Sequence, residues 1–298
     1  MVKRRTFLSR SGRTATITAV AASLSNRLRA EEEAAGGAGY RHSACRWCYS
    51  GIELEDLCVA GKEIGLESIE LVDPGDLALL AKHGLTCAMV NAPGATTAAG
   101  VKVGGIERSF NRVEHHDALV GAYEERLKAA ANGGAKQVIC FSGNRDGLAD
   151  EQGIENCAIG LKRILPTAEK LGLTVVMELL NSKVDHRDYQ CDHTAWGVEL
   201  SKRLDSPNFK LLYDIYHMQI MEGDVIATIR DNHQHICHYH TGGVPGRHEI
   251  DDTQELNYPA IMRAISDTGY TGFVGQEFIP ARPDKLASLK QGVEICSV

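Results

Sequence analysis

The chain has 298 residues, of which 43% are hydrophobic and 24% are charged, as in an ordinary globular protein. This length allows one large α/β domain or two smaller ones. The formal net charge of −7 lacks the basic character of most nucleic-acid-binding proteins, so no nucleic-acid partner is expected.

The first residues have the character of an export signal rather than of a folded domain. Residues 3–8 (KRRTFL) form a twin-arginine signature, and a mildly apolar stretch follows at 15–24. That stretch is too short to cross a membrane, so stable membrane insertion is not expected. We therefore predict a Tat-type signal peptide at 1–30, a flexible linker at 31–39 and export to the periplasm. The alternative is a basic tail without regular structure.

From residue 40 onward, strand-like and helix-like segments alternate. Short apolar runs bounded by turn residues predict buried strands, and apolar residues at helical spacing predict amphipathic helices. The expected strands are 43–49, 68–71, 85–90, 137–141, 173–178, 210–214, 235–240 and 272–278. The expected helices are 53–64, 74–83, 113–131, 151–171, 192–204, 222–232, 258–268 and 284–295. Pro166 predicts a kink or a break in its helix, and 91–109 is expected to be a long loop.

Eight β–α units within residues 40–298 predict a single-domain α/β fold, the (β/α)8 TIM barrel. Such a barrel typically needs about 250 residues. An open, doubly wound sheet also alternates strands and helices, but it more often carries a glycine-rich nucleotide loop after its first strand. Tyr49-Ser50-Gly51 does not provide that loop.

The nine cysteines indicate buried thiols rather than disulfides. Their number is odd, so they cannot all pair within one chain. Most of them lie in apolar segments, where a free cysteine behaves as a small hydrophobic residue. Cys45 and Cys48 form a C-x-x-C sequence, which is expected to lie in the first strand.

Four predicted strands carry acidic or histidine residues at their carboxyl ends. In a barrel, the carboxyl ends of all strands meet at the face that holds the active site. Any one of these side chains alone could equally cap the next helix. All four at equivalent positions favour a site for a divalent cation such as Mg²⁺ or Mn²⁺. The four residues are Glu178, Asp214, His240 and Glu277.

Longer motifs around these residues make the comparison more specific. They are Met177–Lys183, Tyr213–Gln219, His238–His240 with Val244–Arg247, Asn257–Tyr258 and Val274–Phe278. From about residue 43 onward the chain resembles the hydroxypyruvate isomerase family, which belongs to the xylose-isomerase-like barrels of sugar isomerases and epimerases.

The resemblance implies roles for six residues. A divalent metal would be held by Glu178, Asp214, His240 and Glu277. The two glutamates of this set would be catalytic, moving a proton between adjacent carbons. His217 and Arg247 match positions that contact substrate oxygens.

The chemistry that the resemblance implies also makes physical sense. Removing a proton from a carbon beside a carbonyl gives an enediolate, whose negative charge a divalent cation stabilises. Two carboxylates then serve as base and acid. His217 has an alternative role behind the metal ligands, holding Asp214 in place. Glu70 is expected to orient a site residue, Trp47 to form part of a pocket wall and His238 to line the barrel interior.

Three functions remain open at this stage. The first is a metal-dependent isomerase of a small hydroxy-carbonyl compound, of the kind that converts hydroxypyruvate to tartronate semialdehyde. The second is a ketose 3-epimerase, because related epimerases carry His at the position of His240, where many hydroxypyruvate isomerases carry Gln. Leu179 and Lys183 also depart from the Pro and Arg that are frequent in the family. The third is a non-catalytic, exported sugar-binding barrel. Association into a homo-oligomer stays open.

Overall fold

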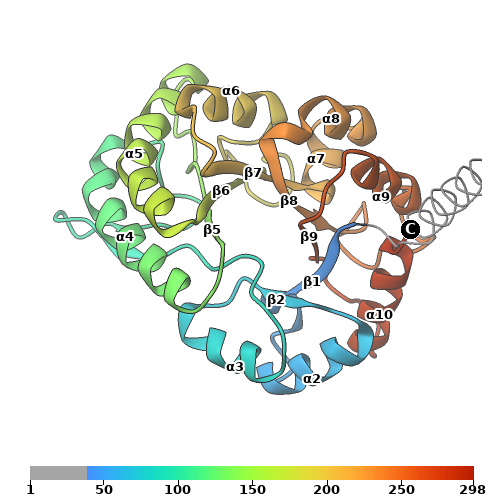
Figure 1. Ribbon diagram of the computed structural model, residues 1–298. Helices are drawn as coiled ribbons and strands as arrows, with labels where there is room; N and C mark the ends of the chain where they lie inside the picture. The colour runs from blue at the N-terminus through green and yellow to red at the C-terminus, as the bar shows by residue number, and fades with distance from the viewer. Residues whose placement is uncertain (1–38) are drawn as a thin grey trace, which may run out of the picture. The chain divides into compact units, whose positions relative to one another are not determined.

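The computed structural model describes residues 39–298, so the predicted signal peptide and nearly all of the predicted linker lie outside the described residues. In Figure 1 the strands form an inner ring and the helices surround it. Seven parallel strands follow one another in the order β2-β1-β9-β8-β7-β6-β5. They are β1 Arg41–Cys45, β2 Ser68–Glu70, β5 Gln137–Cys140, β6 Thr174–Glu178, β7 Phe209–Asp214, β8 Ile236–Thr241 and β9 Phe273–Gln276.

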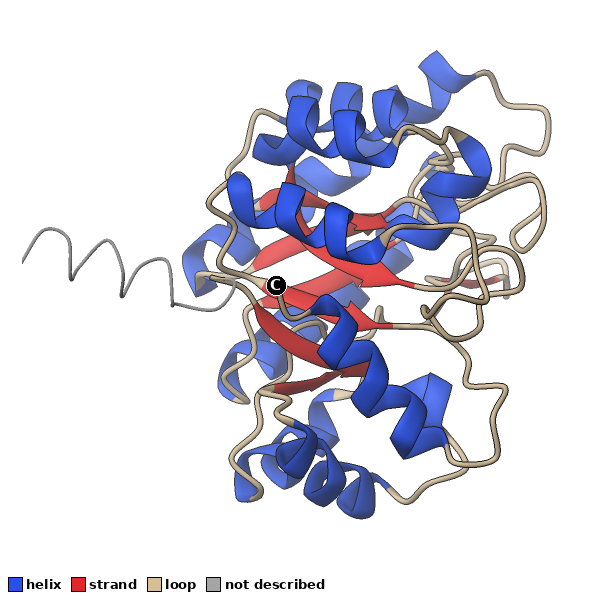
Figure 2. Cartoon of the chain, turned by 90° about the vertical axis from the view of Figure 1, so that its right-hand side faces the viewer, coloured by secondary structure: helices blue, strands red, loops and turns tan. Residues whose placement is uncertain are grey.

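The helices form the outer layer, and the loops at the carboxyl ends of the strands gather at one end of the barrel (Figure 2). The α-helices are α2 Leu54–Ile64, α3 Leu77–Lys82, α4 His116–Asn132, α5 Asp150–Leu171, α6 Thr194–Leu204, α7 Ile215–Met221, α8 Val225–Asn232, α9 Tyr258–Asp267 and α10 Lys285–Cys296. Short 3-10 helices are η1 Arg46–Tyr49, η2 Pro74–Asp76, η3 Val113–His115 and η4 His233–His235. No helix within residues 39–298 has the length and apolar character that a membrane crossing requires. The predicted (β/α)8 TIM barrel is confirmed.

The eighth position of the barrel is irregular, so the prediction of a regular strand at 85–90 is wrong. This segment connects β2 to β5 through isolated bridges such as Val72–Val90 and Val90–Val138. The amide of Ala88 donates to the side-chain oxygen of Ser68 at 2.8 Å instead of to a backbone carbonyl. A side chain therefore replaces one bond of the ladder and interrupts the regular pairing.

The loop at 91–109 also holds more structure than predicted, since β3 Ala95–Thr96 and β4 Lys102–Val103 form a short antiparallel hairpin. The first strand ends at Cys45, and the next four residues turn into η1, so Cys48 lies outside the strand. The chain reverses there because the Arg46 guanidinium donates to the carbonyl of Tyr49 at 2.6 Å.

Two further differences concern helices. α5 runs unbroken through Pro166, which faces solvent beside Lys162, so water can satisfy the carbonyl that loses its amide partner. The additional helix α7 begins directly after β7, because the Asp214 carboxylate accepts a hydrogen bond from the amide of His217 at 3.0 Å.

The barrel interior contains a cluster of apolar side chains and, separately, buried polar side chains. Met89, Ile139, Val176 and Leu212 form a buried cluster contributed by four neighbouring chain segments. All nine cysteines are free thiols and eight are buried, as predicted.

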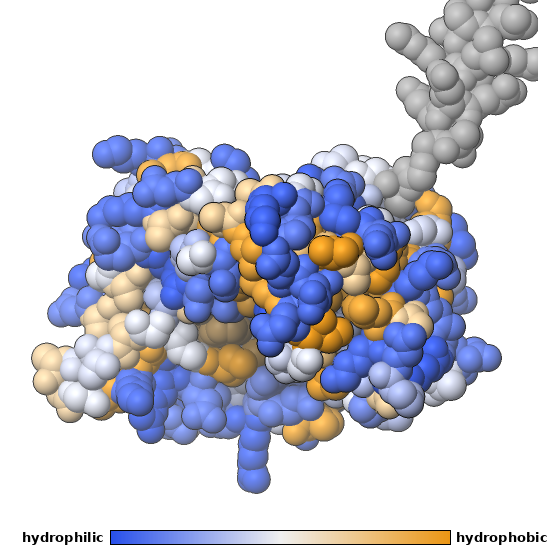
Figure 3. All heavy atoms as spheres, turned by 90° about the horizontal axis from the view of Figure 1, so that it is seen from below, coloured by the Kyte–Doolittle hydropathy of each residue, from blue (hydrophilic) through white to orange (hydrophobic). Residues whose placement is uncertain are grey.

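On the outside, the face shown in Figure 3 is largely hydrophilic, with small apolar patches between the charged side chains.

Candidate active site

The structure brings together the four side chains that the sequence predicted as metal ligands. Glu178 and Asp214 end β6 and β7, His240 lies near the end of β8 and Glu277 directly follows β9. These strands are neighbours in the sheet, and Asp214 pairs with His240 in register. One donor atom from each residue lies within 4.8 Å of the others, and all four side chains are buried. The carboxyl ends of the parallel strands of a barrel lie on one face, which is why this sequence pattern was informative.

His240 stands in the middle of the carboxylates. Its Nδ1 atom lies 2.9 Å from Oε2 of Glu277 and 3.5 Å from Oε1 of Glu178. Burial, together with the charge of Glu277, raises the pKa of Glu178, and burial raises the pKa of Asp214 well above its usual range. Burial acts on Glu277 too, but His240 and Arg247 outweigh it and hold the pKa of that carboxyl well below its usual value.

The donor set fits a divalent cation. Three carboxylates and one imidazole are packed within a few ångströms, an arrangement that costs free energy unless a positive charge compensates it. Oε1 of Glu178 is buried and has no hydrogen-bond partner among the described residues. A carboxylate oxygen in that situation is available to a cation, and oxygen-rich sets of this kind suit Mg²⁺ or Mn²⁺.

Arg247 borders the same site. Its guanidinium lies 2.5 Å from Oε2 of Glu277 and 3.4 Å from Oδ2 of Asp214. It is held between the rings of Trp47 and Tyr216, with ring-centre distances of 5.1 and 5.3 Å. Arg247 also lines a cavity beside these residues, as its predicted contact with substrate requires.

His217, also predicted to contact substrate, lies behind Asp214 instead of on the cavity wall. It is fully buried, and its Nδ1 atom accepts a hydrogen bond from the side-chain amide of Asn181 at 2.6 Å. Its Nε2 atom lies 3.7 Å from Oδ2 of Asp214. Burial and the charge of Arg247 lower the pKa of His217 well below its usual range, so this imidazole is neutral at pH 7. The geometry favours the alternative role, in which His217 positions Asp214.

Three further residues were predicted to lie around the site: Trp47, Glu70 and His238. The indole nitrogen of Trp47 donates to Oε1 of Glu277 at 2.9 Å, and Trp47 lines the cavity, as expected of a wall residue. Glu70 contacts Nε2 of His240 at 2.6 Å and Nε2 of His238 at 2.8 Å, so it is placed to orient a site residue. His238 is fully buried in the barrel interior.

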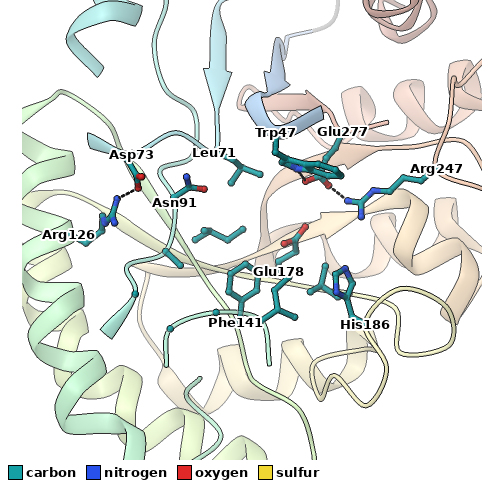
Figure 4. A pocket seen from close by; sticks show the side chains of 17 residues that line it. Trp47, Leu71, Asp73, Asn91, Arg126, Phe141, Glu178, His186, Arg247 and Glu277 are labelled. Carbon is teal, nitrogen blue, oxygen red and sulfur yellow. Dashed lines mark hydrogen bonds and ion pairs between the residues drawn. The ribbon is translucent and has the colours of Figure 1, made fainter. Parts of the chain in front are cut away.

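The site opens into a cavity of about 670 Å³ (Figure 4). Several of its wall residues had no signal in the sequence. His186 lies in a loop after β6, Asn91 follows the irregular eighth segment, and Arg126 lies in the middle of α4. Helical periodicity marks Arg126 only as a polar position, and only the folded barrel shows that it faces the cavity.

Several known proteins are similar to this chain. The family model for the xylose isomerase-like TIM barrel matches residues 60–296. The 2-oxo-tetronate isomerase of Cupriavidus necator is 30% identical over 237 residues, which cover 76% of this chain and 86% of that protein. The hydroxypyruvate isomerase of Escherichia coli is 28% identical over 225 residues, 73% of this chain and 84% of that protein.

Among solved structures, a family 2 AP endonuclease from Brucella melitensis superposes with a TM-score of 0.75 at 25% identity. The match covers 85% of this chain and 98% of that one. The two sequence relatives are isomerases, so the prediction of an enzyme of this class is confirmed. The chain belongs to the xylose isomerase-like TIM barrel family.

Proposed function

We propose that this protein is a divalent-metal-dependent isomerase that moves a carbonyl group between adjacent carbons of a hydroxy-carbonyl substrate. The observation that carries the proposal is the convergence of Glu178, Asp214, His240 and Glu277 within 4.8 Å beside a cavity. The isomerase relatives support the reaction class. The type reaction is the conversion of hydroxypyruvate to tartronate semialdehyde.

Four residues of this chain would hold the metal ion, and two of them would also transfer protons. The four donors would hold a Mg²⁺ or Mn²⁺ ion, which acts when bound as a Lewis acid for the oxygens of the substrate. Glu178 and Glu277 enter the cavity from different sides, so one can face the carbon that loses a proton while the other faces the carbon that gains it (Figure 4).

The proton transfers can be divided between the two carboxyl groups if one starts as the carboxylate and the other in its protonated form. One carboxylate takes a proton from the hydroxyl-bearing carbon, which leaves an enediolate. The other carboxyl group delivers a proton to the former carbonyl carbon, while the hydroxyl proton passes to the neighbouring oxygen. The Arg247 guanidinium lies beside both Glu277 and Asp214, where it stabilises negative charge on substrate oxygen.

The second candidate is a ketose 3-epimerase, and the imidazole of His240 in the donor set is the observation that favours it. Epimerisation uses the same two steps, but the proton returns to the carbon that lost it, from the opposite face. A non-catalytic sugar-binding barrel has no need of two carboxylates at the cavity, so this alternative is less favoured. The net charge of −7 argues against a nucleic-acid substrate.

The testing experiment combines metal analysis with solvent exchange. The protein is purified, its metal content is measured, and entry of solvent deuterium into hydroxypyruvate and into D-fructose is followed. About one ion per chain together with deuterium exchange supports the proposal. Absence of both would favour the sugar-binding alternative. We also propose that residues 1–30 direct export to the periplasm through the Tat system, as their twin-arginine signature indicates.

A further inference from the structure

The cavity continues well past the proposed metal ligands. Glu277 and Arg247 lie at one end, and the paired side chains of Asp73 and Arg126 lie at the other (Figure 4). We propose that the far half of the cavity is a second subsite that binds a neutral sugar ring, so that the natural substrate is a ketose joined to a second sugar. This inference rests on the proposed isomerase function only for what happens at the reacting end.

Size is the first argument. A liquid-water molecule occupies about 30 Å³, so a three-carbon keto acid of about seven non-hydrogen atoms fills at most roughly 200 Å³. The cavity has a volume of about 670 Å³. A keto-disaccharide of about 23 non-hydrogen atoms needs at most roughly 700 Å³ by the same measure. Hydroxypyruvate would therefore leave most of the cavity unfilled.

The chemistry of the far half is the second argument. The cavity wall as a whole is mainly apolar, with Leu71, Ile106 and Phe141 among the lining residues, of which Phe141 lies beside Glu178 (Figure 4). A sugar ring presents C–H groups on its faces and hydroxyls at its edge, so it can lie against such a wall and bond to polar groups at the rim. The polar groups at this rim are Asn91 and the Asp73–Arg126 pair.

The Asp73–Arg126 pair favours neutral hydroxyl groups over anions. Nη1 of Arg126 lies 2.6 Å from Oδ1 of Asp73, and the side chains of Arg126 and Asp73 are 17% and 63% exposed, so the pair lies at the mouth of the cavity. The carboxylate neutralises the guanidinium, so the pair offers both donors and acceptors without a net charge. A phosphate or carboxylate on the substrate would meet Asp73 as a like charge. The pair therefore selects for an uncharged second sugar.

Backbone conformation is the third argument. Six residues other than glycine have positive φ angles among the described residues, and four of them are aspartates, which tolerate this conformation. The other two are Leu71 at 54° and Arg247 at 58°, and both line the cavity. Such conformations are strained for residues other than glycine and cluster at ligand sites. Leu71 is thus held in a strained position on the cavity wall, with its amide bonded to the carbonyl of Met89 at 2.7 Å.

The loop that brings Gly105 and Ile106 to the cavity wall is also firmly placed. Gly104 has a φ of 102°, and a Cβ atom there would lie only 2.1 Å from the carbonyl oxygen of Pro93. The two arms of the β3–β4 hairpin therefore approach as closely as a glycine allows, which fixes Gly105 and Ile106 on the wall.

The experiment measures binding and turnover separately. The purified, Mn²⁺-loaded protein is titrated calorimetrically with hydroxypyruvate, D-fructose, lactulose, maltulose and isomaltulose, three disaccharides that end in the same ketose but differ in linkage or second sugar. Solvent deuterium exchange is measured on the same compounds. We expect at least one disaccharide to bind at least tenfold more tightly than D-fructose and to exchange with at least tenfold higher kcat/KM.

Variants then locate the preference. Asn91→Ala removes a polar side chain beside Asp73 (Figure 4), and Arg126→Ala removes the far ion pair. Each should lower the disaccharide-to-fructose ratio of kcat/KM at least tenfold. Arg163→Ala is the matched control, because Arg163 forms an ion pair with Asp117 at 2.9 Å and does not line the cavity. It should leave the ratio unchanged.

The outcomes separate the two proposals. The subsite is overturned if no disaccharide binds more tightly than D-fructose, or if Asn91→Ala and Arg126→Ala leave the ratio of kcat/KM unchanged. Exchange confined to hydroxypyruvate or D-fructose would keep the isomerase and remove the subsite. Tight disaccharide binding without any exchange would keep the subsite and remove the isomerase.

Discussion

The Nε2 atom of His240 lies 2.6 Å from a carboxylate oxygen of Glu70, which reaches it across the barrel interior from the end of β2. Both side chains are fully buried. The contact is possible because residue 275 is glycine, where a Cβ atom would lie 2.8 Å from both Glu70 and His240. With Nε2 engaged in this way, Nδ1 is directed at Glu178 and Glu277. A buried carboxylate behind a histidine fixes the ring orientation and tautomer that a metal ligand needs.

Glu70→Gln is expected to weaken Mn²⁺ binding about 10–100-fold, because the amide keeps the volume but loses the negative charge that orients His240. Affinity is measured by electron paramagnetic resonance of free Mn²⁺ during titration. His238→Gln is the comparison, since it removes a different hydrogen-bond partner of Glu70 and leaves the contact with His240 in place. It should have the smaller effect. Equal affinity of Glu70→Gln and the unchanged protein would mean that Glu70 does not orient the ligand.

Glu277→Gln is expected to lower the rate of deuterium exchange by about 10²–10⁴, the usual contribution of a positioned acid or base. The amide has nearly the same shape, so circular dichroism should show an intact fold. Glu155→Gln, on an exposed face of α5, serves as the control and should exchange normally. Near-normal exchange by Glu277→Gln would remove this residue from the mechanism.

Asp214→Asn is expected to lose bound metal on dialysis, while the amide oxygen can still cap α7. Because burial raises the pKa of Asp214 beside two other carboxylates, removing its charge should also relieve repulsion. We therefore expect the chelator-treated variant to melt about 2–4 °C higher than the chelator-treated parent, a gain of about 1 kcal/mol. Elemental analysis and thermal melting check the two effects. Full metal retention would refute the ligand assignment.

His42 should make stability depend on pH. Burial lowers its pKa from 6.5 to about 4. Between these two pH values His42 is protonated in the unfolded chain and neutral in the folded chain. Stability is therefore fully present above pH 6.5 and falls between 6.5 and 4. The ring is partly exposed, which limits the effect to about 1–2 kcal/mol.

His42→Gln should remove this part of the pH dependence when urea unfolding is compared at pH 7 and pH 5. The exposed His233→Gln is the control and should behave like the parent. An unaltered difference between the two pH values in His42→Gln would show that another group is responsible.

Replacing Arg4 and Arg5 by lysine should block export, because the Tat system recognises the arginine pair. Cell fractionation of the two forms checks this expectation. If the unchanged chain itself stays in the cytoplasm, the signal-peptide assignment is wrong.

The sequence predicted the barrel and the convergence of Glu178, Asp214, His240 and Glu277, because strand periodicity places these residues at equivalent ends. It did not predict the irregular eighth segment, whose ladder is interrupted by the Ser68 side chain from another part of the chain. Tertiary contacts of that kind leave no local pattern.

The same reason explains what was missed at the site. α7 was overlooked since its capping residue, Asp214, is also the last residue of a strand. The far end of the cavity joins Asp73, next to η2, to Arg126 in α4, two positions that only folding brings together. Local patterns thus identified the reacting end and gave no signal for the remote end.

The free cysteines of the barrel would make its unfolding detectable with thiol reagents. Burial raises the pKa of thiols such as those of Cys45, Cys140 and Cys157 well above the usual range, and only the thiolate reacts readily. The folded barrel therefore resists alkylating reagents, whereas an unfolded chain exposes all nine thiols at once. Under oxidising conditions that exposure would allow mispaired disulfides, so the lifetime of the protein would be set by its rate of unfolding.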